Sequence, residues 1–199
     1  MSNEKPILFK DEMIRAILEG WKTQTRRIVK PCKCKDSLCE LAPHEIAGEI
    51  NRGHYRNCPY GKPGDRLWVR ENFLQLMHGQ VTDGRVKYCA SIDPRSTGTP
   101  KNDGYWWRKR PSIHMPRWAS RITLEITDVR VERLQDISSA DAKAEGVATP
   151  DLNDWCDDSK WVSQFAWLWR SINGPDSWDA NPWVWVIEFK RIDQEAKAA

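Results

Sequence analysis

The chain has 199 residues, of which 40% are hydrophobic and 30% are charged, and its formal net charge is +3. This length fits one domain with a sizeable core, and the composition is that of a globular protein rather than a disordered chain. No apolar run approaches the roughly 18 residues that a membrane-spanning helix needs, and the first residues lack an apolar signal segment. We therefore expect a cytoplasmic protein that does not enter a membrane.

The first third of the chain shows clear strand and helix patterns. The predicted elements are a strand at 6–9, a helix from Asp11 to Gly20, a strand at 22–29 and, after a Pro-Gly-Asp turn, a strand at 66–71. Asp11 is a typical N-cap and Gly20 a typical helix end. Between Pro31 and Gly64, Cys, Pro, Gly and charged residues interrupt every apolar run, so we expect an irregular insertion there.

The rest of the chain adds strands and two helices. The predicted elements are a hairpin at 81–86 about Asp83-Gly84, a loop at 93–112, a strand at 122–131, a helix at 140–145 capped by Ser138 or Ser139, a helix from Ser159 to Gly174, and a strand at 183–190. Helices do not alternate regularly with strands, which argues against a doubly wound sheet. The pattern predicts an α+β fold, a small mixed β-barrel of five or six strands with flanking helices.

The segment KTQTRR at 22–27 places a lysine three residues before a threonine. A threonine hydroxyl becomes a nucleophile when a base takes its proton, and lysine can be that base when burial or nearby cations lower its pKa. In a regular strand Lys22 and Thr25 would point to opposite faces, so a twist or bulge is needed to bring them together. The alternative is a strand that exposes polar residues to solvent.

Basic residues gather in two segments, 22–35 and 101–121, and in the second they are interleaved with Tyr, Trp and His. Cations beside aromatic rings suit single-stranded nucleic acid, because they neutralise phosphates while the rings stack on bases. The same mixture arises when Arg stems pack over Trp rings on an ordinary surface. The candidate binding residues are Arg26, Arg27, Arg108, Arg110, His114, Arg117 and Trp118, together with Glu71, which we expect to pair with Arg70 or Arg27.

Four local matches, in the right order, resemble the ASCH domain family, whose fold is similar to the PUA RNA-binding barrel. The matching segments are Leu18-Glu19-Gly20 with the following 22–27, then 63–67, 140–146 and the closing strand 184–190. The stretches 58–71 and 112–119 look like the phage- and prophage-encoded branch of the family.

The resemblance implies a PUA-like barrel and an active site. A compact bacterial member of the family is an amidohydrolase that removes the acetyl group from N4-acetylcytidine with a lysine, a threonine and a glutamate. By position these residues fall on Lys22 as base, Thr25 as nucleophile and Glu145 as proton donor. An arginine of the same strand falls on Arg27, with a binding role. The resemblance implies no required cofactor and a modified nucleoside, such as an N4-acylated cytidine, as substrate.

The resemblance also implies a single ASCH/PUA-like domain over residues 1–192. Relative to the compact members, the chain carries insertions at about 31–60, 75–112 and 147–160, and we expect the tail at 193–199 to fray. Insertions beside a barrel mouth can reshape a substrate pocket. The expected substrates therefore extend to related modified nucleosides.

The cysteines offer a candidate structural metal site within the first insertion. Cys32, Cys34, Cys39 and Cys58 could supply four soft ligands to a zinc ion, and His44 and His54 lie between them. Such an ion would stabilise an insertion too small to have a core of its own. Against zinc, the Cys-x-Cys spacing is tighter than the usual knuckle. Ordinary thiols are the alternative.

Two other functions stay open. A non-catalytic RNA- or DNA-binding module could hold a nucleotide in the same cleft, and a ribonuclease has some family support, although no His pair suggests the usual acid/base chemistry. A pocket the size of one nucleoside would favour the amidohydrolase. A continuous basic groove joining the two basic segments would favour the binding module. The sequence does not predict an oligomeric state.

Overall fold

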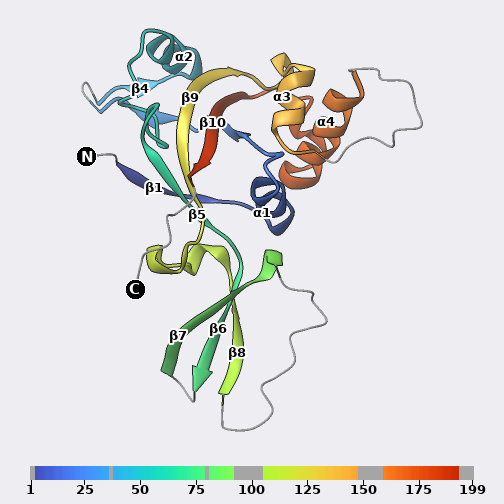
Figure 1. Cartoon of the computed structure of the whole chain (residues 1–199). Coiled ribbons are helices and arrows are strands. Elements are labelled where there is room, and N and C mark those ends of the chain that lie inside the picture. Colours follow the sequence, from blue (N-terminus) through green and yellow to red (C-terminus); the bar gives the residue numbers. More distant parts are fainter. Residues whose placement is uncertain (1–2, 36–37, 79–80, 92–104, 148–158, 193–199) are drawn as a thin grey trace.

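The computed structural model describes residues 3–35, 38–78, 81–91, 105–147 and 159–192 (Figure 1). At its centre lies a five-stranded sheet with the strand order β1-β5-β9-β10-β2. The strands are β1 (Glu4–Leu8), β2 (Gln24–Ile28), β5 (Arg66–Arg70), β9 (Thr123–Arg133) and β10 (Trp183–Ile192). β1 runs parallel to β5, and the other neighbours are antiparallel. The molecule is therefore a mixed α+β protein, as predicted.

The predicted closed barrel is not confirmed. The order of the strands leaves β1 and β2 as the two edges of an open sheet. A side chain links these edges: Arg27 on β2 donates Nη2 to the main-chain oxygen of Leu8, at the end of β1, over 2.5 Å. One side-chain hydrogen bond does not make a ladder, so the described part of the sheet does not close.

Helices cover the two faces of this sheet. On one face, α1 (Asp11–Leu18) and α2 (Pro43–Asn51) supply buried side chains to a core that also contains Val129, Trp185 and Ile187. On the other face, α3 (Ser139–Ala144) and α4 (Ser159–Asn173) pack over Val184 and Val186 (Figure 1). Successive side chains of a strand point to opposite faces, so Trp185 and Ile187 of β10 lie in one core and Val184 and Val186 lie in the other.

A second, three-stranded sheet forms a separate lobe below the first in Figure 1. Its order is β7-β6-β8, with β6 (Phe73–His78) between β7 (Val81–Tyr88) and β8 (Tyr105–Arg110). We call it the β6–β8 lobe. Phe73 at its base packs with Met115 and Ala119, so the segment after β8 attaches one face of the lobe to the body.

The expectation of an irregular insertion at 31–64 was wrong in its middle. The segment contains a short hairpin, β3 (Cys32–Lys33) with β4 (Glu40–Leu41), and then helix α2. The Glu45 carboxylate accepts a hydrogen bond from the Ala42 N–H at 2.8 Å, which satisfies a donor at the start of α2. Ile46, Ala47 and Ile50 of α2 are buried in the main core. Their helical spacing could have predicted α2, but the surrounding Cys, Pro and charged residues favoured an irregular segment.

The predicted hairpin about Asp83-Gly84 was also wrong. His78 of β6 pairs with Val81 of β7, so Asp83-Gly84 lies inside β7 and not at a turn between the two strands. The register of β6 and β7 shifts at this point, and Gly84 has a φ of +82°. The Asp-Gly pair thus belongs to an irregularity within a strand, where glycine also tolerates the left-handed backbone.

The loop expected at 93–112 was wrong over residues 105–110, which form strand β8 and pair with β6 in the second sheet, and residues 93–104 lie outside the described residues. The other predicted helices and strands are confirmed within a few residues. The N-cap of α1 is Lys10 rather than Asp11, and that of α3 is Ser138, whose side chain accepts from the Asp141 N–H. Short 3₁₀ turns occur at η1 (Cys89–Ser91), η3 (Ser112–His114), η4 (Arg117–Ala119), η5 (Leu134–Asp136) and η6 (Pro175–Ser177). Most of the expected insertion at 147–160 and the tail at 193–199 lie outside the described residues. None of the helices in the described ranges has the length and apolar character required to cross a membrane.

Candidate functional site

The turn between α1 and β2 brings Lys22 to Glu145, which follows α3. Lys22 Nζ donates to Glu145 Oε2 over 2.9 Å and to the main-chain oxygen of Glu145 over 2.7 Å, and both residues are buried. Backbone hydrogen bonds fix the turn: Lys22 N–H donates to Ala16 O at 3.1 Å, and Thr23 N–H donates to Ala144 O at 2.9 Å. Two segments 123 residues apart are thereby joined in one buried ion pair.

Gly146 permits this close approach. Its φ is +74°, and a Cβ at this position would lie 2.7 Å from Lys22 Cβ and 3.1 Å from Ala16 Cβ. Real Cβ atoms do not approach another carbon to 2.7 Å, so a side chain here would push the α1–β2 turn away. The helix end predicted at Gly146 is therefore also the contact surface for Lys22.

The surroundings of Lys22 shift its pKa downward. Burial lowers the pKa of Lys22, Glu145 raises it, and the guanidinium groups of Arg27 and Arg26 lower it further. The net effect is a pKa below the ordinary lysine value. A lysine of this kind gives up its proton more readily than an exposed one, as a general base must.

Arg26 lies on the face of β2 opposite to that of its neighbour Thr25, and three carboxylates hold its guanidinium group. Its Nη2 atom lies 2.6 Å from Glu132 Oε1 and 3.2 Å from Asp141 Oδ2, and Nη1 lies 3.3 Å from Glu145 Oε1. Gln24, with its amide oriented so that both ends find partners, donates to Asp141 Oδ1 at 3.0 Å and accepts from Arg26 at 2.6 Å. The carboxylate of Glu145 is thus held by Lys22 and Arg26 together.

A second arginine extends this network. Arg130 on β9 contacts Glu132 at 3.1 Å and Asp141 at 3.0 Å, and it also pairs with Glu188. Burial raises the pKa of Asp141, but Arg130 and Arg26 outweigh this effect and hold the pKa below its usual value. This network was not predicted from the sequence, because charged residues that alternate with Val129 and Val131 suggest a strand face exposed to solvent.

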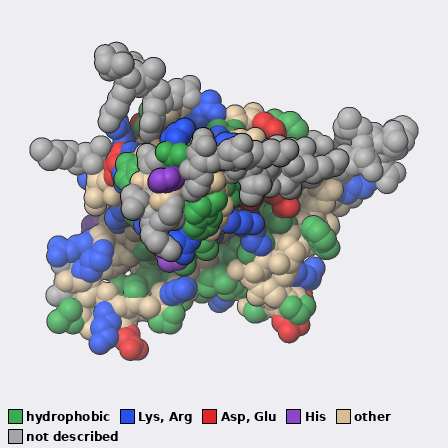
Figure 2. Space-filling view, turned by 90° about the horizontal axis from the view of Figure 1, so that it is seen from below, with side chains coloured by type: hydrophobic (Ala, Val, Ile, Leu, Met, Phe, Trp, Pro, Cys, Tyr) green, Lys and Arg blue, Asp and Glu red, His purple; other side chains and the backbone are tan. Residues whose placement is uncertain are grey.

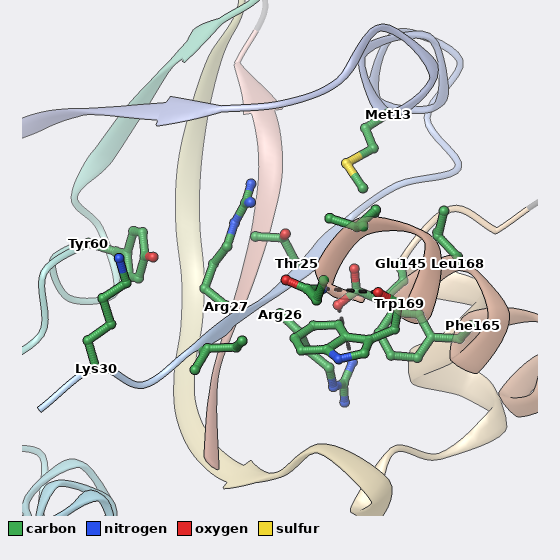
Figure 3. A pocket seen from close by; sticks show the side chains of 13 residues that line it. Met13, Thr25, Arg26, Arg27, Lys30, Tyr60, Glu145, Phe165, Leu168 and Trp169 are labelled. Atoms are coloured by element: carbon green, nitrogen blue, oxygen red, sulfur yellow. Dashed lines mark hydrogen bonds and ion pairs between the residues drawn. The ribbon is translucent and has the colours of Figure 1, made fainter. Parts of the chain in front are cut away.

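Thr25 lines a cavity of about 310 Å³ beside β2, which we call the Thr25 cavity (Figure 3). The cavity has a cationic and polar end with Arg27, Lys30 and Tyr60, and an apolar end with Phe165, Leu168 and Trp169. Thr25 and Glu145 lie between the two ends (Figure 3). A ligand in this cavity would therefore meet a hydroxyl and a carboxylate at its middle.

Arg27 contributes a fixed positive charge to the polar end. It donates to Leu8 O, and its guanidinium carbon lies 5.3 Å from the centre of the Phe9 ring. Burial lowers the pKa of Arg27, but an arginine stays protonated in proteins because its ordinary pKa exceeds 12. Burial raises the pKa of Tyr60, and Arg27 lowers it in part, so the Tyr60 hydroxyl keeps its proton.

The apolar end contains an unused donor. Trp169 is buried, and among the described residues its Nε1–H has no hydrogen-bond partner. An unsatisfied buried N–H costs free energy, so a ligand oxygen that reached it would be bound favourably. Trp169 packs in the core beneath α3 and α4, and it also lines the cavity.

A larger cavity of about 550 Å³ adjoins the first and separates α1 from α4. The two cavities share Met13, Glu145, Leu168 and Ile172. Trp21 and Trp167 line the larger one and are both exposed. Glu145 can therefore be approached from two sides.

Other predicted binding residues lie away from this site. Glu71 is buried and pairs with Arg121 through two hydrogen bonds of 2.8 and 2.9 Å, so the expected pairing with Arg70 or Arg27 was wrong. Arg117 pairs with Glu4, Arg110 donates to Gln75, and His114 and Trp118 are exposed. Arg108 is exposed on β8.

The two basic segments occupy different parts of the molecule. Arg26 and Lys22 of the first segment are buried in ion pairs beside α3, whereas Arg108 of the second segment lies in the β6–β8 lobe (Figure 1). Neither the Thr25 cavity nor the larger cavity beside it is lined by a residue of the second segment.

The cysteines are spread between the core and the surface. Cys58 is buried in the main core, which raises the pKa of its thiol, and Cys34 Sγ accepts a hydrogen bond from Asn57 Nδ2 at 3.9 Å. Cys32 is half-buried and Cys39 is exposed. No group of three or more His, Cys, Asp or Glu side chains in the described ranges is arranged to hold a metal ion. The zinc site stays a prediction from the sequence.

Comparisons with known proteins give a distant structural similarity. No family model matches the chain, and no curated protein matches it in sequence. Among solved structures, the crystal structure of protein EF3133 from Enterococcus faecalis V583, described by the family model DUF984, aligns with a TM-score of 0.43 and 10% identity. The alignment covers 100% of this chain and 86% of that chain. The ASCH resemblance therefore rests on the sequence motifs alone.

Proposed function

We propose that the protein is an amidohydrolase that acts on an N4-acylated cytidine or a related modified nucleoside. Thr25 is the nucleophile, Lys22 the general base and Glu145 the proton donor. The observation that carries the proposal is the buried contact of 2.9 Å between Lys22 and Glu145 beside a cavity that Thr25 lines. Two of the three residues that the family resemblance implies are thus in contact, although they are far apart in sequence.

The contact supports proton transfer between Lys22 and Glu145. Lys22 takes the proton from the Thr25 hydroxyl as the oxygen attacks the amide carbonyl, and the proton passes through Glu145 to the departing N4 amine. The C–N bond breaks and an acyl-threonine ester forms. Water then attacks the ester, with Lys22 again as base, and releases the acid and free Thr25. The lowered pKa of Lys22 suits the first step.

The dimensions of the Thr25 cavity suit a small substrate. Its volume of about 310 Å³ is near the lower end of the ~300–1,000 Å³ typical of small-molecule sites. The rings of Phe165 and Trp169 offer apolar area to a base or an acyl group, and Arg27 and Lys30 offer charge to a polar group at the other end. A pocket with room for a single nucleoside favours the amidohydrolase over a module that binds a nucleic-acid polymer.

The test is hydrolysis of N4-acetylcytidine and a panel of other N4-acylated cytosines by the purified protein. Thr25→Val removes the hydroxyl at nearly constant volume and should abolish turnover, whereas Thr25→Ser should retain part of it. Lys22→Met and Glu145→Gln should each lower turnover by at least about 100-fold, the loss expected when a general acid or base is removed. Mass spectrometry of the unmodified protein, quenched with acid during turnover, should detect acyl-Thr25, and the same treatment of Thr25→Val should not.

The matched control is Thr23→Val. Thr23 belongs to the same motif, but its side chain is exposed and it precedes β2. Its substitution should leave turnover unchanged. The proposal fails if Thr25→Val, folded as judged by its circular dichroism, retains full activity, or if no member of the panel is hydrolysed.

One observation favours a binding role for the same cavity as the second candidate. Both acceptors of Lys22 belong to Glu145, so the pair also joins the α1–β2 turn to α3. A purely structural pair beside a cavity would leave a site that holds a nucleotide without cleaving it. Calorimetric binding of cytidine derivatives without any turnover would support this candidate.

A further inference from the structure

We propose that one face of the β6–β8 lobe binds single-stranded nucleic acid. This proposal is independent of the hydrolase activity, because it concerns a different sheet. The strands of the lobe carry five cations, two in β7 and three in β8, and their only acidic residue is Asp83. Figure 2, which views the molecule from the end that carries the lobe, shows Lys, Arg and His side chains among hydrophobic ones there.

The strand register divides these residues between two faces. Leu74 of the central strand pairs with Lys87 on one side and with Lys109 on the other, so these side chains share a face. By alternation Trp107, opposite Leu76, and Tyr105, opposite His78, lie on the same face. We call it the Lys87–Trp107 face.

Side-chain contacts confirm the assignment. Lys87 Nζ lies 4.6 Å from the centre of the Trp107 ring, although β6 separates the two strands. Arg85 lies 5.9 Å from the Tyr105 ring, whose centre is 4.6 Å from that of His78. Cations and aromatic rings thus alternate across a single sheet surface.

The opposite face has a different use. Phe73, Val86 and Tyr88 lie there and pack with Met115 and Ala119 of the body. Arg108 and Arg110 of β8 are also on that face, because they pair with Gln75 and Phe73. The candidate residues that the sequence placed in one basic segment are therefore divided, and the Lys87–Trp107 face excludes Arg108 and Arg110.

The chemistry of the Lys87–Trp107 face selects its ligand. Lys87, Lys109 and Arg85 are exposed, and Tyr105 and Trp107 are half-buried. Exposed cations attract phosphates, while rings on a flat sheet offer stacking surfaces to unpaired bases. In a duplex the flat faces of the bases are stacked on one another, and an acidic peptide has no bases. A single strand of nucleic acid can therefore use both the cations and the aromatic rings of this face.

The experiment measures binding of a fluorescent 12-nucleotide oligo(dT) to the full chain by anisotropy, over a series of salt concentrations. Lys87→Ala and Lys109→Ala should each weaken binding and reduce the salt slope by about 0.7, the value for one phosphate contact on a single strand. Trp107→Leu should weaken binding at least about fivefold through lost stacking. Far-UV circular dichroism checks that each variant keeps the lobe folded.

The matched control is Arg108→Ala, which removes a cation from the neighbouring position of the same strand but from the opposite face. It should leave affinity and salt slope near those of the unmodified protein. The proposal is overturned if Arg108→Ala weakens binding as much as Lys109→Ala, or if the oligonucleotide does not bind saturably. Equal affinity for an abasic oligomer or for polyglutamate would also overturn it, because either result removes the role of stacked bases.

Discussion

Substitution of Gly146 by alanine tests the packing that joins Lys22 to Glu145. An alanine with a φ of +74° costs roughly 1–2 kcal/mol, because the left-handed backbone brings Cβ against the following carbonyl. Its Cβ would also lie 2.7 Å from Lys22 Cβ, and relief of such overpacking costs about 1–3 kcal/mol. We expect Gly146→Ala to lower the free energy of unfolding by about 2–5 kcal/mol in urea denaturation.

Gly20→Ala is the control that separates the two contributions. Gly20 has a φ of +84°, but no heavy atom lies within 4 Å of its ideal Cβ. Only the backbone cost of roughly 1–2 kcal/mol should appear. If the proposed function holds, Gly146→Ala should also lower turnover by about 10- to 100-fold through displacement of Lys22, since a shift of about 1 Å has effects of that size. Equal destabilisation by both substitutions would refute the steric argument.

Three further predictions concern charge. Because burial lowers the pKa of Lys22, turnover should rise as pH increases, and the midpoint of this rise should lie below pH 10.5. A midpoint at or above pH 10.5 would contradict the prediction. Asp141→Asn should cost about 1.5–3 kcal/mol at pH 7 through lost charge-assisted hydrogen bonds to Arg130. The pKa of Asp141 is lower in the folded than in the unfolded protein, so its carboxylate stabilises the fold above the unfolded pKa, and this stabilisation is lost as pH falls through the folded pKa. The difference in free energy of unfolding between Asp141→Asn and the unmodified protein, measured in urea, should therefore shrink toward about pH 3. Glu71→Gln should cost up to about 3–5 kcal/mol by unpairing Arg121, with an unchanged KM in the Thr25 cavity; unaltered stability would contradict it.

Local patterns in the sequence predicted many of the elements. The helix at α4 follows from apolar residues at helical spacing between Ser159 and Gly174, and the alternation in β10 identified the residues that face the main core. Periodicity is readable from the sequence because burial of one face repeats every 3.6 or every 2 residues. The same method failed at α2, where only three buried residues carry the period.

The sequence by itself therefore predicted the types of most elements, and it identified a lysine-threonine motif that follows the first helix. Only the tertiary structure decided that Lys22 meets Glu145, because that contact depends on how α3 packs against the turn after α1. The same holds for the three carboxylates that hold Arg26 and for the division of cations between the faces of the β6–β8 lobe. Ion pairs and strand register join residues distant in sequence, and no local period encodes them.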